Sequence, residues 1–126
     1  MEICHNKTRY LLYIDRCSAH EFGTLGEFVA ADVRVNGEAC GLEKYIEGLS
    51  DIAAAFPNFH WRIEQLLAEG DWLAARFTDT GTHRIEPPGD PATGRIIIRQ
   101  ELAMYRLVGG KIADVWGDLS LAEMEA

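Results

Sequence analysis

Apolar residues in the first half of the chain recur every three or four positions, which is the period of an amphipathic helix. One such stripe predicts a helix from Asn6 to about Ala19, and another predicts a helix from Gly41 to Phe56. Pro57 ends that second helix, because its ring lacks an N–H donor and clashes with the preceding turn. Between the two, the pattern predicts a short helix after the Gly23-Thr24 pair and a short alternating strand over residues 31–37.

After Pro57 the period of the pattern changes to two, which is typical of β-strands. We expect strands over residues 59–69, 72–83, 96–108 and 111–119. Gly109-Gly110 turns the chain between the last two strands, and the proline-rich residues 87–91 form a loop, because proline cannot donate to a sheet. Helices first and antiparallel strands second predict an α+β fold with one curved sheet and helices on one side. A strongly curved sheet that is closed by helices forms a cone, and the interior of such a cone can hold a small ligand.

Length and composition limit the classes of protein to consider. The 126 residues suit a single domain, residues 1–126, and a hydrophobic content of 48% is typical of a globular core. Twelve basic and 20 acidic residues give a net charge of −8, so we expect no nucleic-acid partner. The apolar run from Tyr10 to Ile14 is too short to span a bilayer and has no secretory-signal pattern, so we expect a cytoplasmic protein without a membrane partner.

Several segments of the second half form a characteristic combination. They are Phe56-Pro57, Glu69 to His83, Pro91 to Arg95 with the isoleucine-rich strand after it, and Tyr105-Arg106 with Gly110-Lys111-Ile112 and Trp116. This combination resembles the SnoaL-like polyketide cyclase family over about the last two-thirds of the chain. The resemblance implies the cone-shaped α+β barrel of the nuclear transport factor two-like superfamily, in which N-terminal helices cap a strongly curved, mostly antiparallel sheet. It further implies a homodimer through the outer sheet face, a small hydrophobic or aromatic ligand, and no metal or organic cofactor.

The chemistry that the resemblance implies is an intramolecular aldol closure. One carboxylate removes a proton beside a carbonyl, and the resulting enolate attacks a ketone, which requires a positioned base and hydrogen-bond donors on the developing oxyanion. The family's acid/base aspartate lies on the last strand and points inward. Asp118 is the nearest acidic residue in this sequence, followed by Asp114.

Two registers are open for the last two strands, because residues two apart share a face of a sheet. Aligning the chain with the family's closing hairpin favours the odd-numbered residues as the inward ones. The last strand then presents no proton-transfer group, and Glu101 beside Arg99 on the fourth strand becomes the candidate base in place of Asp118. Burial would raise the pKa of Glu101, whereas Arg99 would lower it.

Further candidates for substrate binding are Asn36, His83, Tyr105 and Trp116, each of which also has a structural interpretation. Asn36 could serve the turn before Gly37, His83 could close the turn before the proline loop, and tryptophans are often core or dimer surface. The sequence holds no His-x-His or His-Glu-x-x-His spacing, so we expect no metal site.

These observations leave three hypotheses for the function. The leading one is cofactor-free cyclase or isomerase chemistry on a polyketide-type carbonyl compound. A second is a non-catalytic binding protein that has kept the pocket and lost the catalytic acid. A third is a hydrolase or dehydratase, which needs two or more carboxylates or histidines converging inside. An inward carboxylate beside a donor would favour an enzyme.

Overall fold

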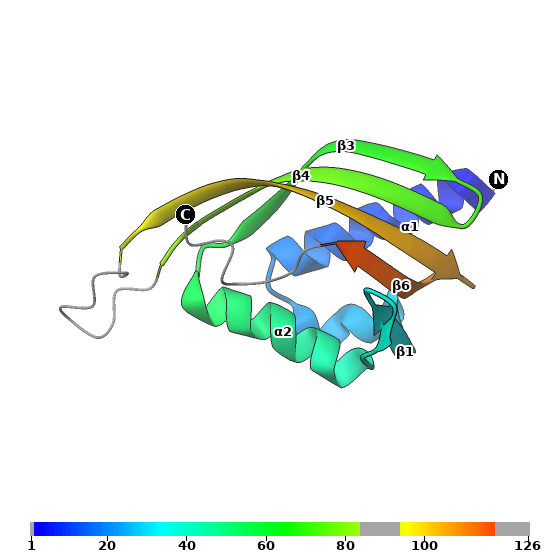
Figure 1. The fold of residues 1–126 in the computed structure, drawn as a ribbon, viewed down its shortest axis with the longest axis horizontal. Helices are drawn as coiled ribbons and strands as arrows, with labels where there is room; N and C mark the ends of the chain where they lie inside the picture. The colour runs from blue at the N-terminus through cyan, green and yellow to red at the C-terminus, as the bar shows by residue number, and fades with distance from the viewer. Residues whose placement is uncertain (1, 84–93, 118–126) are drawn as a thin grey trace.

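The computed structural model describes residues 2–83 and 94–117, and the helices and strands there follow the predicted order (Figure 1). The elements are α1 (Glu2–Ser18), the 3₁₀ helix η1 (Phe22–Glu27), β1 (Val29–Val35), β2 (Glu38–Ala39), α2 (Leu42–Ala55), β3 (His60–Glu69), β4 (Trp72–Thr82), β5 (Ile96–Val108) and β6 (Lys111–Gly117). The short strand β2 has no counterpart among the predicted elements. Within these described ranges, neither helix is long and apolar enough to cross a membrane.

The strands form one curved sheet in the order β2-β1-β6-β5-β4-β3, and α1 and α2 lie on its concave side (Figure 1). All neighbouring strands are antiparallel except β1 and β6, which are parallel. The β1–β6 pair therefore places the first strand of the chain beside the last strand that the structure describes. The predicted α+β class is confirmed, although the sheet remains open, with β2 and β3 as its edges.

Alternation along β5 decides which side chains face the helices. Its buried residues are Ile97, Glu101, Ala103, Tyr105 and Leu107, whereas its even-numbered neighbours are mostly exposed. The odd-numbered face of β5 is therefore the inward one, as the closing hairpin suggested. Because the strands pair antiparallel with Asp79 opposite Arg99, the odd-numbered residues of β4 face inward as well.

A β-bulge interrupts the alternation in β6. Leu107 pairs with Ile112, but Arg106 pairs with Asp114, so Ala113 is one extra residue on the β6 side. The bulge allows Ile112 to be buried although its number is even. After the bulge, the odd-numbered residues face inward.

The outer face of β6 therefore carries its acidic and aromatic side chains. Trp116 is 44% exposed, whereas Val115 is fully buried. Asp114 lies on the outer face between two guanidinium groups, with its carboxylate oxygens 2.7 Å from Arg106 Nε and 3.8 Å from Arg34 Nε. Neither Asp114 nor Trp116 points into the cone.

The core lies between the helices and the concave side of the sheet. Ile14 and the other buried residues of α1 pack there, because their spacing of three or four positions puts them on one face of the helix. Each large apolar side chain that is buried completely contributes roughly 1.5–3 kcal/mol to folding. The fully buried members include Tyr10, Leu25, Val33, Phe56, Leu73, Phe77, Ile112 and Val115.

Gly81 on β4 allows the end of α2 to approach the sheet closely. A Cβ atom built on Gly81 would lie 3.1 Å from Phe56 Cβ and 3.1 Å from Phe59 Cδ1. Such distances are shorter than ordinary carbon–carbon contacts, so a larger residue would push these rings away. The two phenylalanines flank Pro57, and Phe59 lines the cavity described next.

Candidate functional site

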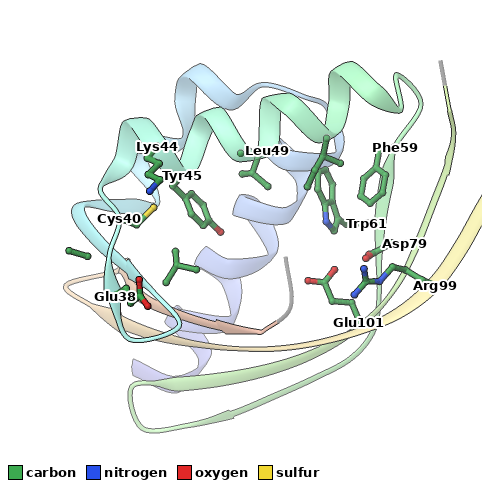
Figure 2. A pocket seen from close by; sticks show the side chains of 14 residues that line it. Glu38, Cys40, Lys44, Tyr45, Leu49, Phe59, Trp61, Asp79, Arg99 and Glu101 are labelled. Atoms are coloured by element: carbon green, nitrogen blue, oxygen red, sulfur yellow. The ribbon is translucent and has the colours of Figure 1, made fainter. Parts of the chain in front are cut away.

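A cavity of about 280 Å³ lies between α2, the β1–β2 segment and the concave face of β3, β4 and β5 (Figure 2). Its middle is apolar, and polar groups lie toward its two ends. The described residues that line it are Val35, Glu38, Ala39, Cys40, Lys44, Tyr45, Gly48, Leu49, Ile52, Phe59, Trp61, Asp79, Arg99 and Glu101. A cavity of this size fits a small organic molecule rather than a macromolecule.

One end of the cavity carries two carboxyl groups and a guanidinium group. Asp79 on β4 stands directly opposite Arg99 on β5, and Glu101 follows two residues later on the same face. Asp79 is only 1% exposed and Glu101 only 7% exposed. Figure 2 shows the three side chains grouped together below Trp61. The pairing of β4 with β5 thus brings two carboxyl groups and one guanidinium group together at this end of the cavity.

Burial raises the pKa of the Asp79 carboxyl above its ordinary value, while a hydrogen bond with Glu101 and the positive charge of Arg99 oppose the shift. Two carboxyl groups that hydrogen-bond to each other must share a proton, because two adjacent negative charges repel. One carboxylate, one carboxylic acid and Arg99 then sum to zero charge. The pair therefore offers a proton acceptor and a proton donor side by side.

The aromatic wall of the cavity is held in place by the last residue of α1 and by His20 just after it. Ser18 Oγ donates to Trp61 O at 3.2 Å and accepts from Trp61 N at 3.3 Å. His20 Nε2 lies 2.8 Å from Phe59 O, and the rings of Phe59 and Trp61 pack edge to face with centroids 4.5 Å apart. The start of β3 is thereby fixed, and the two rings form one aromatic wall of the cavity.

The opposite end of the cavity carries Glu38, Cys40 and Lys44, from β2 and the beginning of α2 (Figure 2). Glu38 and Lys44 are exposed and Cys40 is half-buried. This end is therefore closer to solvent than the carboxyl end.

A model of the SnoaL-like polyketide cyclase family matches residues 7–126. This chain belongs to the SnoaL-like polyketide cyclase family. A comparison with curated proteins found no match.

Solved structures show the same fold as this SnoaL-like protein. A SnoaL-like polyketide cyclase from Agrobacterium tumefaciens is 30% identical, with a TM-score of 0.81 over 93% of this chain and 92% of that chain. IdmH from Streptomyces antibioticus is 23% identical, with a TM-score of 0.82 over 95% of this chain and 94% of that chain. TsrD from Streptomyces laurentii is 18% identical, with a TM-score of 0.82 over 100% of this chain and 98% of that chain. One fold can host many chemistries, so the likeness in fold does not by itself identify the reaction.

Of the residues predicted from sequence, Arg99 and Glu101 line the cavity of the SnoaL-like protein together. Asp118 lies outside the described residues. Asn36 is exposed and pairs through its side chain with the backbone of Gly117, at 2.8 Å and 2.9 Å. It is not among the residues that line the cavity.

Three other predicted binding residues also lie away from the cavity lining. Tyr105 is buried against Tyr10, with ring centroids 4.6 Å apart. Trp116 is on the outer face of the sheet. The His83 backbone N–H donates to Arg95 O at 2.8 Å, and its ring packs edge-on against Phe56. His83 therefore joins the two strand ends that flank residues 84–93.

Sequence reasoning did not select Asp79. A signal for it existed, because Asp79 continues the alternation of Leu73, Ala75 and Phe77, which are all buried. An acidic residue on such an apolar face is rarely buried without a functional or structural partner. The pairing of that face with Glu101 could be recognised only once the register of β4 against β5 was known.

Proposed function

We propose that this SnoaL-like protein catalyses proton transfer at the carbon beside a carbonyl of a polyketide-type compound, as a cyclase or isomerase. The observation that supports this function is the buried Asp79–Glu101 pair beside Arg99, at one end of an otherwise apolar cavity. An inward carboxyl group beside a cationic donor is what acid/base catalysis requires. A binding protein for apolar ligands has no use for a buried acid pair, which is unfavourable to folding.

The proposed reaction needs only the side chains at this end of the cavity. The ionised member of the Asp79–Glu101 pair accepts a proton from the acidic carbon, and the C–H bonding electrons form the enolate. In a cyclisation, the enolate carbon then bonds to a second carbonyl carbon of the same molecule, and the alkoxide formed there takes back a proton from the pair. Arg99 orients the substrate and compensates the negative charge.

Burial suits Asp79 for this role. The efficiency of a general base rises when its pKa approaches the pH of the reaction, and burial moves the pKa of Asp79 in that direction. The hydrogen bond with Glu101 and the positive charge of Arg99 limit the shift.

The convergence of two carboxyl groups also favours a second candidate, a dehydratase. In that reaction one carboxylate removes the carbon-bound proton while the neighbouring carboxylic acid protonates the departing hydroxyl group. Loss of water from a hydroxyketone, measured by mass spectrometry, distinguishes the dehydratase from the cyclase, whose product keeps the mass of the substrate.

The proposed function is tested by exchange of the acidic protons of 2-tetralone, a flat bicyclic ketone, in D₂O followed by NMR. We expect the wild-type protein to accelerate the exchange, and Asp79→Asn and Glu101→Gln each to reduce this acceleration by about a hundredfold or more. Glu69→Gln is the matched control, because Glu69 is an exposed acid at the end of β3. Full acceleration in both amide variants would remove the pair from the mechanism.

We also propose that the outer face of the sheet binds a second copy of the chain. The register aligns Leu67, Ala74, Met104 and Trp116 in one row across β3, β4, β5 and β6. Leu102 beside this row is 71% exposed, and a continuous apolar row of this kind is typical of an interaction surface. Light scattering should give twice the 14.1 kDa mass of the chain, and Leu102→Glu should reduce it to one chain. A wild-type protein that is monomeric at micromolar concentration contradicts this assembly.

A further inference from the structure

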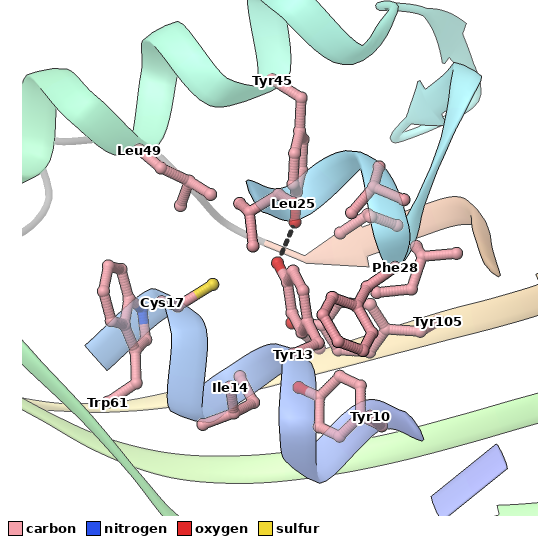
Figure 3. Packing of buried hydrophobic residues seen from close by; sticks show 14 of the residues in the cluster. Tyr10, Tyr13, Ile14, Cys17, Leu25, Phe28, Tyr45, Leu49, Trp61 and Tyr105 are labelled. Carbon is pink, nitrogen blue, oxygen red and sulfur yellow. Dashed lines mark hydrogen bonds between the residues drawn. The ribbon is translucent and has the colours of Figure 1, made fainter. Parts of the chain in front are cut away.

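All four tyrosines of the chain are buried where α1, α2 and β5 meet (Figure 3). The rings of Tyr10, Tyr13 and Tyr105 pack on one another with centroids 4.6–6.3 Å apart. Tyr45 reaches this group from α2, and its hydroxyl oxygen lies 2.5 Å from that of Tyr13. This short hydrogen bond joins the two helices across the core.

Tyr45 is the member of the pair that lines the cavity, whereas Tyr13 lies behind it, 3% exposed and outside the set of lining residues. Figure 2 shows the Tyr45 ring extending from α2 with its hydroxyl toward the middle of the cavity. Burial is the largest cause that raises the pKa of Tyr45, and the charge of Glu101 adds to it. The Tyr45 hydroxyl thus lies within electrostatic range of Glu101.

Tyr13 and Tyr45 carry two hydroxyl protons but share one hydrogen bond, so one O–H group of the pair is available to a further acceptor. Burial raises the pKa of both Tyr13 and Tyr45, so each hydroxyl keeps its proton at neutral pH. Only one of the two protons can lie between the oxygens. When Tyr13 donates to Tyr45, the Tyr45 O–H is free to donate into the cavity.

Without an acceptor in the cavity, the pair has a second arrangement. Tyr45 can donate to Tyr13, whose own O–H then turns to the buried Cys17 thiol. A hydrogen bond between Tyr13 and Cys17 acts on that thiol, although burial raises the pKa of Cys17 to about 12. The two arrangements differ only by rotation of hydroxyl groups, so an arriving acceptor selects the first one.

We propose that Tyr45 donates the hydrogen bond that orients the ligand's oxygen, that Tyr13 is its positioning residue, and that the cavity takes a flat cyclic ketone or its enol. The hydrogen bond from Tyr45 and the contact with the apolar walls describe how the ligand is bound, and they do not depend on the proposed reaction. Only the orientation of the ligand's acidic carbon toward Asp79 and Glu101 rests on the proposed function. A neutral tyrosine that holds its proton tightly is a donor to both the ketone and the enolate oxygen. A ring without this oxygen leaves the donor unused, so the site discriminates against it.

The test compares 2-tetralone with tetralin, the same bicyclic skeleton without the oxygen. We expect Tyr45→Phe to weaken binding of 2-tetralone by about five- to tenfold, the range for loss of one hydrogen bond, and to change the affinity for tetralin less than about twofold. The ¹³C resonance of 2-tetralone labelled at the carbonyl carbon, shifted downfield in the wild-type complex, should move back upfield. Tyr13→Phe should produce a smaller shift in the same direction, because Tyr45 remains and loses only its partner.

Tyr10→Phe is the matched control. Its hydroxyl is buried, does not line the cavity and takes no part in the hydrogen bond between Tyr13 and Tyr45, so affinity and carbonyl resonance should stay at wild-type values. Equal weakening of both ligands by Tyr45→Phe, or a carbonyl resonance that this variant leaves unchanged, would overturn the proposal. Absence of measurable 2-tetralone binding to the wild-type protein would overturn the ligand class.

These readouts are separate from those of the proposed function. If Asp79→Asn and Glu101→Gln lose proton exchange while Tyr45→Phe leaves the carbonyl resonance unchanged, the acid pair stands and Tyr45 is not the donor. If Tyr45→Phe moves the resonance while both amide variants exchange protons at the wild-type rate, the donor stands and the acid pair is not catalytic.

Discussion

Asn36 holds the end of β6 against the end of β1, its parallel neighbour in the sheet. Its backbone is in the left-handed region, with φ of 51°, and its N–H donates to Val115 O at 2.8 Å. Its side-chain amide forms the two hydrogen bonds that a neighbouring strand's backbone would form, since Nδ2 donates to Gly117 O at 2.8 Å and Oδ1 accepts from Gly117 N at 2.9 Å. Replacing Asn36 therefore tests whether its amide serves the sheet or the ligand.

Two substitutions separate the side-chain bonds from the backbone conformation. Asn36→Gly removes both bonds but keeps a residue that adopts positive φ without strain, so the free energy of unfolding should fall by about 2 kcal/mol, at roughly 1 kcal/mol for each bond. Asn36→Ala removes the same bonds and adds left-handed strain of about 1 kcal/mol, for a fall of about 3 kcal/mol.

Urea unfolding followed by tryptophan fluorescence measures these differences, with a common slope for all variants. We expect stability in the order wild type, Asn36→Gly, Asn36→Ala, and an unchanged dissociation constant for 2-tetralone in the folded proteins. Equal stability of the wild type and Asn36→Gly would refute the structural role. Weakened ligand binding without a change in stability would return Asn36 to the binding residues.

Other positions give further expected outcomes. Because burial raises the pKa of Asp79, the folded protein holds a proton that the unfolded chain releases. The free energy of unfolding should therefore fall as the pH rises from about 4 through the raised pKa, and urea unfolding at several pH values measures this fall. Asp79→Asn should make the fall smaller. Gly81→Ala should lower stability by about 1–3 kcal/mol in the same assay, because its methyl group would lie 3.1 Å from Phe56 and Phe59.

The order of the elements could be predicted from the sequence because the period of an apolar pattern is a local property. The stripe that includes Tyr10 and Ile14 predicts α1, and Pro57 marks the end of α2, without reference to any distant residue. The two-residue strand β2 has too few residues to show a period, so it could not be predicted. The same limit explains the bulge at Ala113, which depends on the partner strand β5.

Only part of the candidate site could be predicted from the sequence. Alternation and the family resemblance together placed Arg99 and Glu101 on the inward face of β5, and both line the cavity. Asn36 and Trp116 were also selected, because a sequence does not show whether a polar amide bonds a ligand or the neighbouring strand. Asp79 was not selected, because its significance comes from Arg99 opposite it and Glu101 beside it.

The sequence alone thus determined the order and type of the main helices and strands and the α+β class, because each follows from residues a few positions apart. Only the tertiary structure decided that Asp79 meets Glu101, 22 positions later, and that the Tyr13 hydroxyl lies 2.5 Å from Tyr45, 32 positions later. Such meetings depend on strand register and helix packing, which are set by burial of the whole core rather than by any local pattern.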